Sequence, residues 1–282
     1  MRKNKKPIIA LSIFIIFFLF LYYQNNAVVV TRFSINNEKI PREFKDFKIL
    51  HLSDVHSKVF GKDNGKLIRL IKGESPDIIV ITGDLIDRRH YNEEKAMVLI
   101  DGLKEISPIY FVTGNHEAWS GKFPSLEDKL KDRGVRVLRN EKEIIKKGKA
   151  QIEIIGLDDP AFNTKGYQES YKDASIVDEK LDMLLEDTKN FTILLSHRPE
   201  LFPLYAEKDI DLSFTGHAHG GQIIIPFLGG LAAPNQGFLP KYYRGKYEIG
   251  DATMIVSAGL GNSIIPQRIF NRPEIISVEL GE

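Results

Sequence analysis

The chain alternates between short aliphatic runs and longer segments in which apolar residues recur with helical spacing. Continuous apolar runs such as PDIIVITGD (76–84) and PIYFVTGNHE (108–117) predict strands that are buried on both faces. Apolar positions three and four apart predict helices over 65–73 and 92–106. This alternation predicts an α/β fold with a largely parallel sheet in the first half, whereas strands dominate the second half.

The same patterns predict the remaining elements. Further helices are expected over 125–134 and 176–187, and residues 160–175 have the composition of an exposed loop. Further strands are expected over 27–35, 47–54, 135–138, 151–159, 191–199, 209–219, 252–261 and 274–280.

The N-terminus differs from the rest of the chain. A basic tip, MRKNKK, precedes sixteen uncharged residues from Ile8 to Tyr23. A signal peptide has the same layout, but this apolar run is long for one and no small-x-small cleavage pattern follows it. We therefore predict an uncleaved, single-pass membrane anchor with the basic tip in the cytoplasm and the rest of the chain outside. The predicted organisation is tip and anchor over 1–26, a connecting strand over 27–44 and one domain over 45–282.

Composition and charge exclude several classes of site and partner. The chain has no cysteine, which excludes disulfide bonds, thiolate metal sites and a cysteine nucleophile. Removing the four basic residues of the tip from the 39 in the chain leaves 35 against 38 acidic residues, a net charge of about −3. We therefore expect no nucleic-acid partner, and no obligate protein partner is indicated.

Five predicted strands end in polar clusters: SDVH, TGDLID, TGNHE, SHRP and TGHAH. Taken singly, Asp84 has the sequence context of a helix cap and Asn115 that of a turn residue. Five of the seven histidines nevertheless fall in these clusters, and α/β sheets bind ligands at the carboxyl ends of their strands. The clusters therefore predict one shared site. Two histidines lie outside it: His51 is expected in the core and His90 in a loop.

In this order, the motifs D-x-H, G-D-x-x-D, G-N-H-E, S-H and G-H-x-H resemble those of the calcineurin-like metallophosphoesterases over about residues 45–282. The resemblance implies a four-layer α-β-β-α sandwich with two metal ions at the strand ends. The anchored start and the glycine-rich later segment resemble a bacterial branch of the family. Some members of that branch hydrolyse the pyrophosphate of UDP-2,3-diacylglucosamine.

The resemblance also implies two ligand sets that share one aspartate. One metal would be bound by Asp54, His56, Asp84 and His219, and the second by Asp84, Asn115, His197 and His217. Side chains two apart on an extended segment share a face, so D-x-H and H-x-H are each expected to aim two groups the same way. Imidazole and carboxylate ligands suit Mn, Fe or Zn.

The expected reaction is attack by a metal-bound hydroxide on a phosphate. His116 adjoins Asn115 without being a ligand, and it is the expected catalytic acid that protonates the leaving oxygen. Asp87 is expected to orient a histidine. Purple acid phosphatases have a tyrosine where this chain has Asp87, so we expect a colourless protein. Arg88, Arg89 and Arg198 are either phosphate clamps or structural residues.

The anchor favours a membrane or lipid-linked phosphodiester or pyrophosphate as substrate, with a role in lipid metabolism. A soluble phosphomonoester or nucleotide is the alternative, and a non-catalytic, metal-stabilised phosphate-binding protein is a third. A cytoplasmic nucleotide-lipid would conflict with the predicted outward-facing domain. The apolar segment 223–239 is expected either to line an acyl-chain groove or to form a strand and buried loop against a second sheet.

Overall fold

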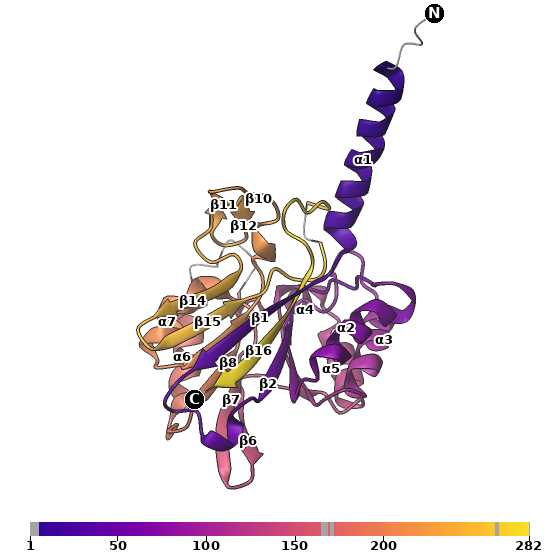
Figure 1. The fold of residues 1–282 in the computed structure, drawn as a ribbon. Coiled ribbons are helices and arrows are strands. Elements are labelled where there is room, and N and C mark those ends of the chain that lie inside the picture. The colour runs from indigo at the N-terminus through magenta and orange to yellow at the C-terminus, as the bar shows by residue number, and fades with distance from the viewer. Residues whose placement is uncertain (1–5, 165–168, 170–171, 263–264, 282) are drawn as a thin grey trace, which may run out of the picture.

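The computed structural model describes residues 6–164, 169, 172–262 and 265–281 (Figure 1). Two six-stranded sheets pack face to face, and helices cover the outer face of each. This arrangement confirms the predicted α/β sandwich. A further helix, α1, projects from one end of the sandwich (Figure 1).

The first sheet has the strand order β1-β16-β2-β3-β4-β5. The strands from β2 to β5 are parallel, and β16 runs antiparallel to β2. Because β1 pairs with β16 along its whole length, the segment that follows α1 is an edge strand of this sheet. The bounds are β1 Val29–Asn36, β2 Lys48–Leu52, β3 Ile78–Thr82, β4 Ile109–Val112, β5 Arg136–Val137 and β16 Glu274–Gly281.

The second sheet has the order β14-β15-β9-β8-β7-β6. Its edge strands β6 and β14 were not predicted, because both are largely exposed and rich in charged residues. Such strands are stabilised mainly by backbone pairing with a neighbour, so they have little apolar pattern of their own. The bounds are β6 Glu141–Lys147, β7 Ala150–Gly156, β8 Thr192–Leu195, β9 Leu212–Thr215, β14 Gly245–Ile249 and β15 Ala252–Val256.

Three apolar layers hold the sandwich together. Aliphatic and aromatic residues of both sheets, including Val80 and Phe214, form the central layer. The strands β3 and β4 are buried at every position, as their continuous apolar runs predicted. Helices α2, α3 and α5 pack on the first sheet, and α6 and α7 on the second. The helix bounds are α2 Gly65–Glu74, α3 Glu93–Lys104, α5 Phe123–Lys131, α6 Asp173–Leu185 and α7 Phe202–Glu207.

Most of the predicted strands that lead into polar motifs end earlier than expected, because the polar residues lie in the loops that follow them. The strand predicted over 108–117 stops at Val112 and is followed by the short helix α4 (Asn115–Ser120). The strand predicted over 209–219 stops at Thr215. Part of the predicted loop 160–175 lies outside the described residues, and α6 begins within it. Short 3-10 helices occur at Arg42–Phe44, Lys62–Asn64, Pro160–Phe162, Pro199–Leu201 and His219–Gly221.

Helix α1 (Lys6–Asn26) contains the predicted anchor. Its 21 residues rise about 32 Å, enough for the hydrocarbon core of a bilayer. In the part of the chain that the structure describes, it is the one helix long and apolar enough to cross a membrane, and its apolar side chains are almost all exposed. Most of the basic tip (residues 1–5) lies outside the described residues.

Between β9 and β14 the chain forms two small hairpins at the end of the domain from which α1 leaves (Figure 1). The predicted buried loop was wrong, because large apolar side chains of segment 223–239, such as Phe227 and Phe238, are exposed to solvent rather than packed against the second sheet. The acyl-chain groove stays a prediction. The bounds are β10 Ile224–Ile225, β11 Gly229–Gly230, β12 Ala232–Ala233 and β13 Gly237–Phe238.

Candidate metal centre

The carboxyl ends of five strands, three from the first sheet and two from the second, converge on one buried cluster of polar side chains. All seven predicted ligands are buried there. They follow β2 (Asp54, His56), β3 (Asp84), β4 (Asn115), β8 (His197) and β9 (His217, His219).

The first donor group contains Asp54, His56, Asp84 and His219. His219 Nε2 lies 3.2 Å from Asp54 Oδ1 and 3.3 Å from His56 Nε2. His56 Nε2 lies 3.7 Å from Asp84 Oδ2. Ligand atoms bound at about 2.1 Å to one transition-metal ion are separated by roughly 3.0–3.4 Å, so this group has the spacing of a single cation site.

The second donor group contains Asp84, His197 and His217. His197 Nε2 lies 3.3 Å from Asp84 Oδ2 and 3.2 Å from His217 Nδ1. The amide oxygen of Asn115 is buried without a hydrogen-bond partner among the described residues, and Asn115 lines the same cavity as Asp84 and His217. An orphaned oxygen beside three converging donors fits a cation as its partner. The shared residue of the two groups is Asp84.

Hydrogen bonds determine which nitrogen two of these histidines offer. His197 Nδ1 is 2.7 Å from the carbonyl oxygen of Thr82 and donates to it, so Nε2 faces the donor group. His217 Nε2 is 3.3 Å from the amide oxygen of Asn235. Arg198 Nη1 lies at the same distance from this nitrogen, so Nε2 faces polar neighbours outside the donor group. Nδ1, which lies 3.2 Å from His197 Nε2, is the nitrogen that faces the donor group.

Burial and neighbouring charge shift the pKa values of the four histidines in the donor groups. Burial lowers the pKa of His56 to about 4 and the pKa values of His217 and His219 well below the ordinary range. These rings are therefore neutral, which is the form that binds metal. Burial also lowers the pKa of His197, but the negative charge of Asp84 outweighs it and the pKa rises to about 10. Without a metal ion, a proton on His197 therefore neutralises the negative charge of Asp84. A bound metal ion would take over that role.

The extended backbone expected for the D-x-H and H-x-H motifs was wrong. Five of the seven predicted ligands lie in tight turns with left-handed backbone conformation rather than on extended segments. Left-handed conformation is unfavourable for residues with a Cβ atom and persists where the surrounding structure imposes it, often at functional sites. The φ values are 49° at Asp54, 48° at His56, 52° at Asp84, 65° at His217 and 49° at His219.

Two glycines allow backbone to approach the ligand carboxylates directly. A Cβ atom on Gly216 would lie 1.8 Å from Ser53 Oγ and 2.5 Å from Asp54 Oδ2. A Cβ atom on Gly114 would lie 2.3 Å from Asp84 Oδ1. Both glycines are therefore required by the positions of the carboxylates beside them.

We predict that Gly216→Ala displaces Asp54, decreases the metal content and lowers hydrolytic activity at least about tenfold, with a loss of roughly 1–3 kcal/mol of stability from overpacking. Metal analysis, initial rates and thermal unfolding of the purified variant would measure these effects. The matched control is Gly73→Ala in α2, where a Cβ atom would meet nothing within 4 Å. Full metal content and activity in Gly216→Ala would contradict the prediction.

His116 lines the same cavity but belongs to neither donor group. Its ring centroid is 4.4 Å from that of His56. Its Nδ1 accepts the backbone N–H of Arg88 at 3.2 Å and lies 3.5 Å from Asp87 Oδ1. Asp87 also lies outside both donor groups, in the position expected of a residue that orients a histidine.

Arg88, Arg89 and Arg198, each expected to be either a phosphate clamp or a structural residue, lie in different surroundings. Arg88 and Arg89 line the cavity, and the Arg88 guanidinium lies 4.7 Å from the centroid of the Trp119 ring. Arg198 is instead buried, and both oxygens of Asp159 accept its N–H groups at 2.6 and 2.7 Å. Arg198 is therefore a structural residue behind the site.

Sequence reasoning missed the residues that support the ligand loops. The buried carboxylate of Glu117 accepts the backbone N–H groups of Asp84 (2.7 Å) and Gly114 (2.8 Å). Asn271 Nδ2 donates to the carbonyl oxygen of His219 at 2.7 Å. Glu117 had a detectable signal, because glutamate three residues after a helix N-cap is typical of a capping box. Asn271 had none, since its partner is distant in the chain.

The two remaining histidines have the environments that the sequence predicted. His51 is fully buried in β2, and its Nε2 is 2.7 Å from Thr82 Oγ1. His90 is exposed in the loop between β3 and α3, near Asp87.

Comparison with known proteins places these features in a family. The sequence model of the calcineurin-like phosphoesterases matches residues 47–221. An uncharacterized metallophosphoesterase of Bacillus subtilis, YkuE, is 31% identical over 259 residues, which are 90% of this chain and 86% of that protein. A transmembrane protein with a metallophosphoesterase domain from Bos taurus is 30% identical over 262 residues, 89% of this chain and 56% of that protein.

Solved structures share the fold at low sequence identity. TT1561 of Thermus thermophilus superposes with a TM-score of 0.52 and 14% identity, covering 76% of this chain and 90% of that chain. A dimetal phosphatase from Danio rerio superposes with a TM-score of 0.50 and 13% identity, covering 84% of this chain and 94% of that chain.

Proposed function

The chain belongs to the calcineurin-like phosphoesterase family, a family of metal-dependent phosphoester hydrolases, and we propose that it uses two divalent ions to hydrolyse a lipid-linked phosphodiester or pyrophosphate. The observation that carries this proposal is the sharing of Asp84 between two groups of metal-ligand atoms, each compact enough for one ion.

The charges of the donor set favour an anionic substrate. Asp54 and Asp84 supply two negative charges, whereas Asn115 and the four histidines are neutral ligands. Two divalent ions would therefore leave an excess of about two positive charges in a buried site, where charge is poorly screened. When bound, such ions polarise phosphate oxygens and lower the pKa of a coordinated water. Mn, Fe and Zn are the metals that this donor set suits.

The side chains around the donor groups have separate roles in this proposal. Arg88 and Arg89 provide positive charge at the cavity wall for the non-bridging phosphate oxygens. His116 Nδ1 is occupied by the Arg88 N–H, with the Asp87 carboxylate nearby, so Nε2 is the nitrogen available to protonate the leaving oxygen. In the charged ring Nδ1 carries a proton and donates to the Asp87 carboxylate, 3.5 Å away, in place of accepting from Arg88.

The position of the cavity supports a lipid-linked substrate. Pro234, between the strands of the second hairpin, and Asn262 contribute to the cavity wall. Asn262 Nδ2 donates to Pro266 O, and the same carbonyl accepts from Asn25 in the last turn of α1. The wall of the cavity therefore adjoins the end of the anchor. We propose an extracytoplasmic domain, by the charge of the basic tip, and a substrate on the outer leaflet.

We predict that the full chain, reconstituted in lipid nanodiscs with Mn²⁺, Zn²⁺ or Fe²⁺, cleaves a lipid-linked pyrophosphate with kcat/KM at least about tenfold above that for the same headgroup without acyl chains. The physical reason is that the anchor holds the cavity at the membrane, where lipid substrate is concentrated. The panel includes bis-nitrophenyl phosphate, a nitrophenyl monoester and a nucleotide.

Equal or faster cleavage of the soluble monoester or nucleotide would refute the lipid-linked part of the proposal. Metal loading and phosphate binding without turnover of any ester would favour a non-catalytic phosphate-binding protein.

A further inference from the structure

Large apolar side chains contact solvent at the turn of the first small hairpin and at the end of the last strand of the second. Phe227 is fully exposed, Leu228 is 66% exposed and Phe238 is 82% exposed, and Leu239 next to it is also exposed. We call these four residues the hairpin patch. Single exposed apolar residues are ordinary in soluble proteins, but aromatic and aliphatic residues grouped at loop tips are typical of an interaction surface.

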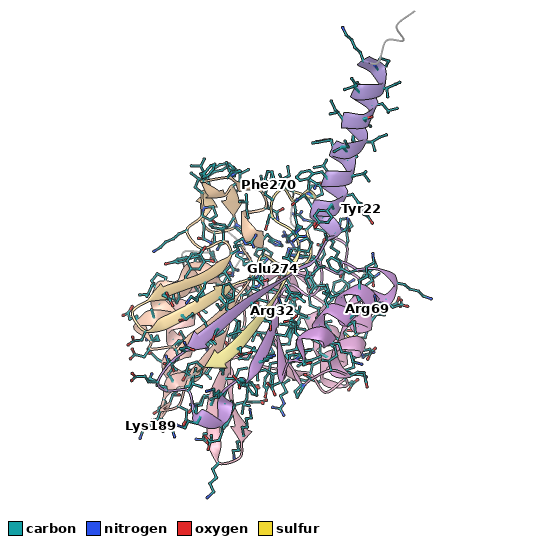
Figure 2. All side chains as sticks on the ribbon, viewed as in Figure 1. Tyr22, Arg32, Arg69, Lys189, Phe270 and Glu274 are labelled. Carbon is teal, nitrogen blue, oxygen red and sulfur yellow. The ribbon has the colours of Figure 1, made fainter. Side chains whose placement is uncertain are left out.

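A short series of contacts connects the hairpin patch to α1. The backbone N–H of Ile224 in β10 donates to the carbonyl oxygen of Ile269 at 3.0 Å. The next residue, Phe270, is 56% exposed, and its ring centroid is 5.7 Å from that of Phe20 in α1. Figure 1 shows the hairpins at the end of the domain where α1 leaves it, and Figure 2 places Phe270 and Tyr22 at that same end.

The domain is attached to α1 by more than the connecting chain. Asn25 Nδ2 donates to the carbonyl oxygen of Pro266 at 2.9 Å, and Asn25 Oδ1 accepts the backbone N–H of Arg268 at 2.8 Å. Arg272 Nη1 donates to the hydroxyl of Tyr23 at 2.6 Å. These bonds hold the last turn of α1 against the loop that contains Phe270, so the orientation of the domain relative to the anchor is fixed at this point.

The anchor therefore sets the depth of the neighbouring loops. Tyr22 and Tyr23 have the character of residues at a membrane–water interface. Phe20 lies two residues before Tyr22 and three before Tyr23, about 3–4.5 Å deeper along the helix axis. Because Phe270 contacts Phe20, the loop that carries it reaches the apolar side of the interface. The first hairpin is bonded to that loop at Ile224, and Leu239 of the second is bonded to Leu231, which follows the first hairpin. Both hairpins therefore lie at the end of the domain from which α1 leaves (Figure 1).

The backbone at three of these exposed residues is in an unfavourable conformation. The φ values are 69° at Phe227, 51° at Leu239 and 54° at Phe270. Bulky side chains rarely adopt left-handed conformation, and none of these three is a buried core residue whose packing would offset the cost. Insertion of the exposed side chains into an apolar phase would offset it.

We propose that the hairpin patch inserts into the membrane interface beside α1 and forms a second, monotopic contact of the domain with the bilayer. The partner is the lipid surface itself, because the patch is continuous with the point at which the anchor enters it. The two contacts together hold the metal-site cavity, whose wall includes Pro234 between the strands of the second hairpin, at the level of the lipid headgroups. The proposal concerns membrane contact and holds for any substrate.

The absence of cysteine makes a direct test possible, because a single introduced cysteine is the only thiol in the chain. We would label full-length Phe227→Cys and Phe238→Cys with an environment-sensitive fluorophore and reconstitute one copy per nanodisc. The control is Met183→Cys in α6, a residue that is 65% exposed. Met183 lies beside the same surface hollow as Lys189, which Figure 2 shows at the end of the molecule opposite Tyr22.

We expect blue-shifted emission and protection from a water-soluble quencher at positions 227 and 238, together with quenching by nitroxide-labelled lipid, and none of these at position 183. Equal accessibility of all three positions would overturn the proposal. So would protection that arises only when two copies share a disc, because that would identify the patch as a contact between copies. Metal content equal to that of the unsubstituted protein would show that the variants fold. The readout does not depend on hydrolysis, so its failure is distinct from failure of the proposed activity.

Discussion

Replacing Asp84 by asparagine is expected to remove both metal ions and to lower hydrolysis of bis-nitrophenyl phosphate by about 10³-fold or more. Asp84 is the carboxylate shared by the two donor groups, and Oδ2 lies 3.7 Å from His56 Nε2 and 3.3 Å from His197 Nε2. Asparagine keeps the shape of the side chain but removes its charge. The loss corresponds to several kcal/mol of transition-state stabilisation.

The measurement is metal content by elemental analysis together with initial rates, on full-length protein in nanodiscs. Asp87→Asn is the matched control, because Asp87 lies in the same loop but outside both donor groups. We expect this control to retain its metal. An Asp84→Asn protein that is folded and still carries two metal ions would show that the shared-ligand assignment is wrong.

The second large effect is expected for His116→Ala. We predict that the variant keeps its metal ions but loses about 10²–10⁴-fold in kcat on a substrate with an alkoxide or phosphate leaving group, because such groups need a proton. On a nitrophenyl ester the loss should be much smaller, since nitrophenolate leaves without protonation. The measurement is kcat on each of the two substrates, together with metal analysis of the same sample.

This pair of substrates separates a catalytic acid from a structural residue. If His116 served only to hold the ligand loops, its removal would lower both rates equally and would reduce metal content. His90→Ala is the matched control, because His90 is an exposed histidine beside the same Asp87 but outside the cavity wall. We expect wild-type rates from it on both substrates.

The elements that the sequence predicted correctly are those whose apolar pattern arises from burial. β3 and β4 are buried on both faces and have uninterrupted aliphatic runs, so their positions could be read from the chain. The edge strands β6 and β14 are charged and exposed, and they are strands because a neighbour pairs with them. Pairing between segments leaves no such pattern in a single sequence.

In the candidate site, too, some properties could be predicted from the sequence and others could not. The family resemblance predicted Asp84 and His217 as ligands, and the folded chain brings both into compact groups of donor atoms. The local conformation expected for the ligand motifs was wrong, because the left-handed backbone at Asp54 and His219 occurs together with hydrogen bonds to distant segments. Arg88 and Arg198 looked equivalent in the sequence, and only the pairing of Arg198 with Asp159 separated them.

The sequence by itself determined the fold class, the apolar N-terminal helix and the residue types that can bind metal. The tertiary structure decided which atoms meet and which side chains stay exposed. The backbone N–H of His217 donates to the Asp54 carboxylate across 163 residues of chain, and Phe270 contacts Phe20 across a still longer separation. Contacts of this kind depend on how the whole chain packs, so the exposure of the hairpin patch and the geometry of the donor groups could come only from the folded molecule.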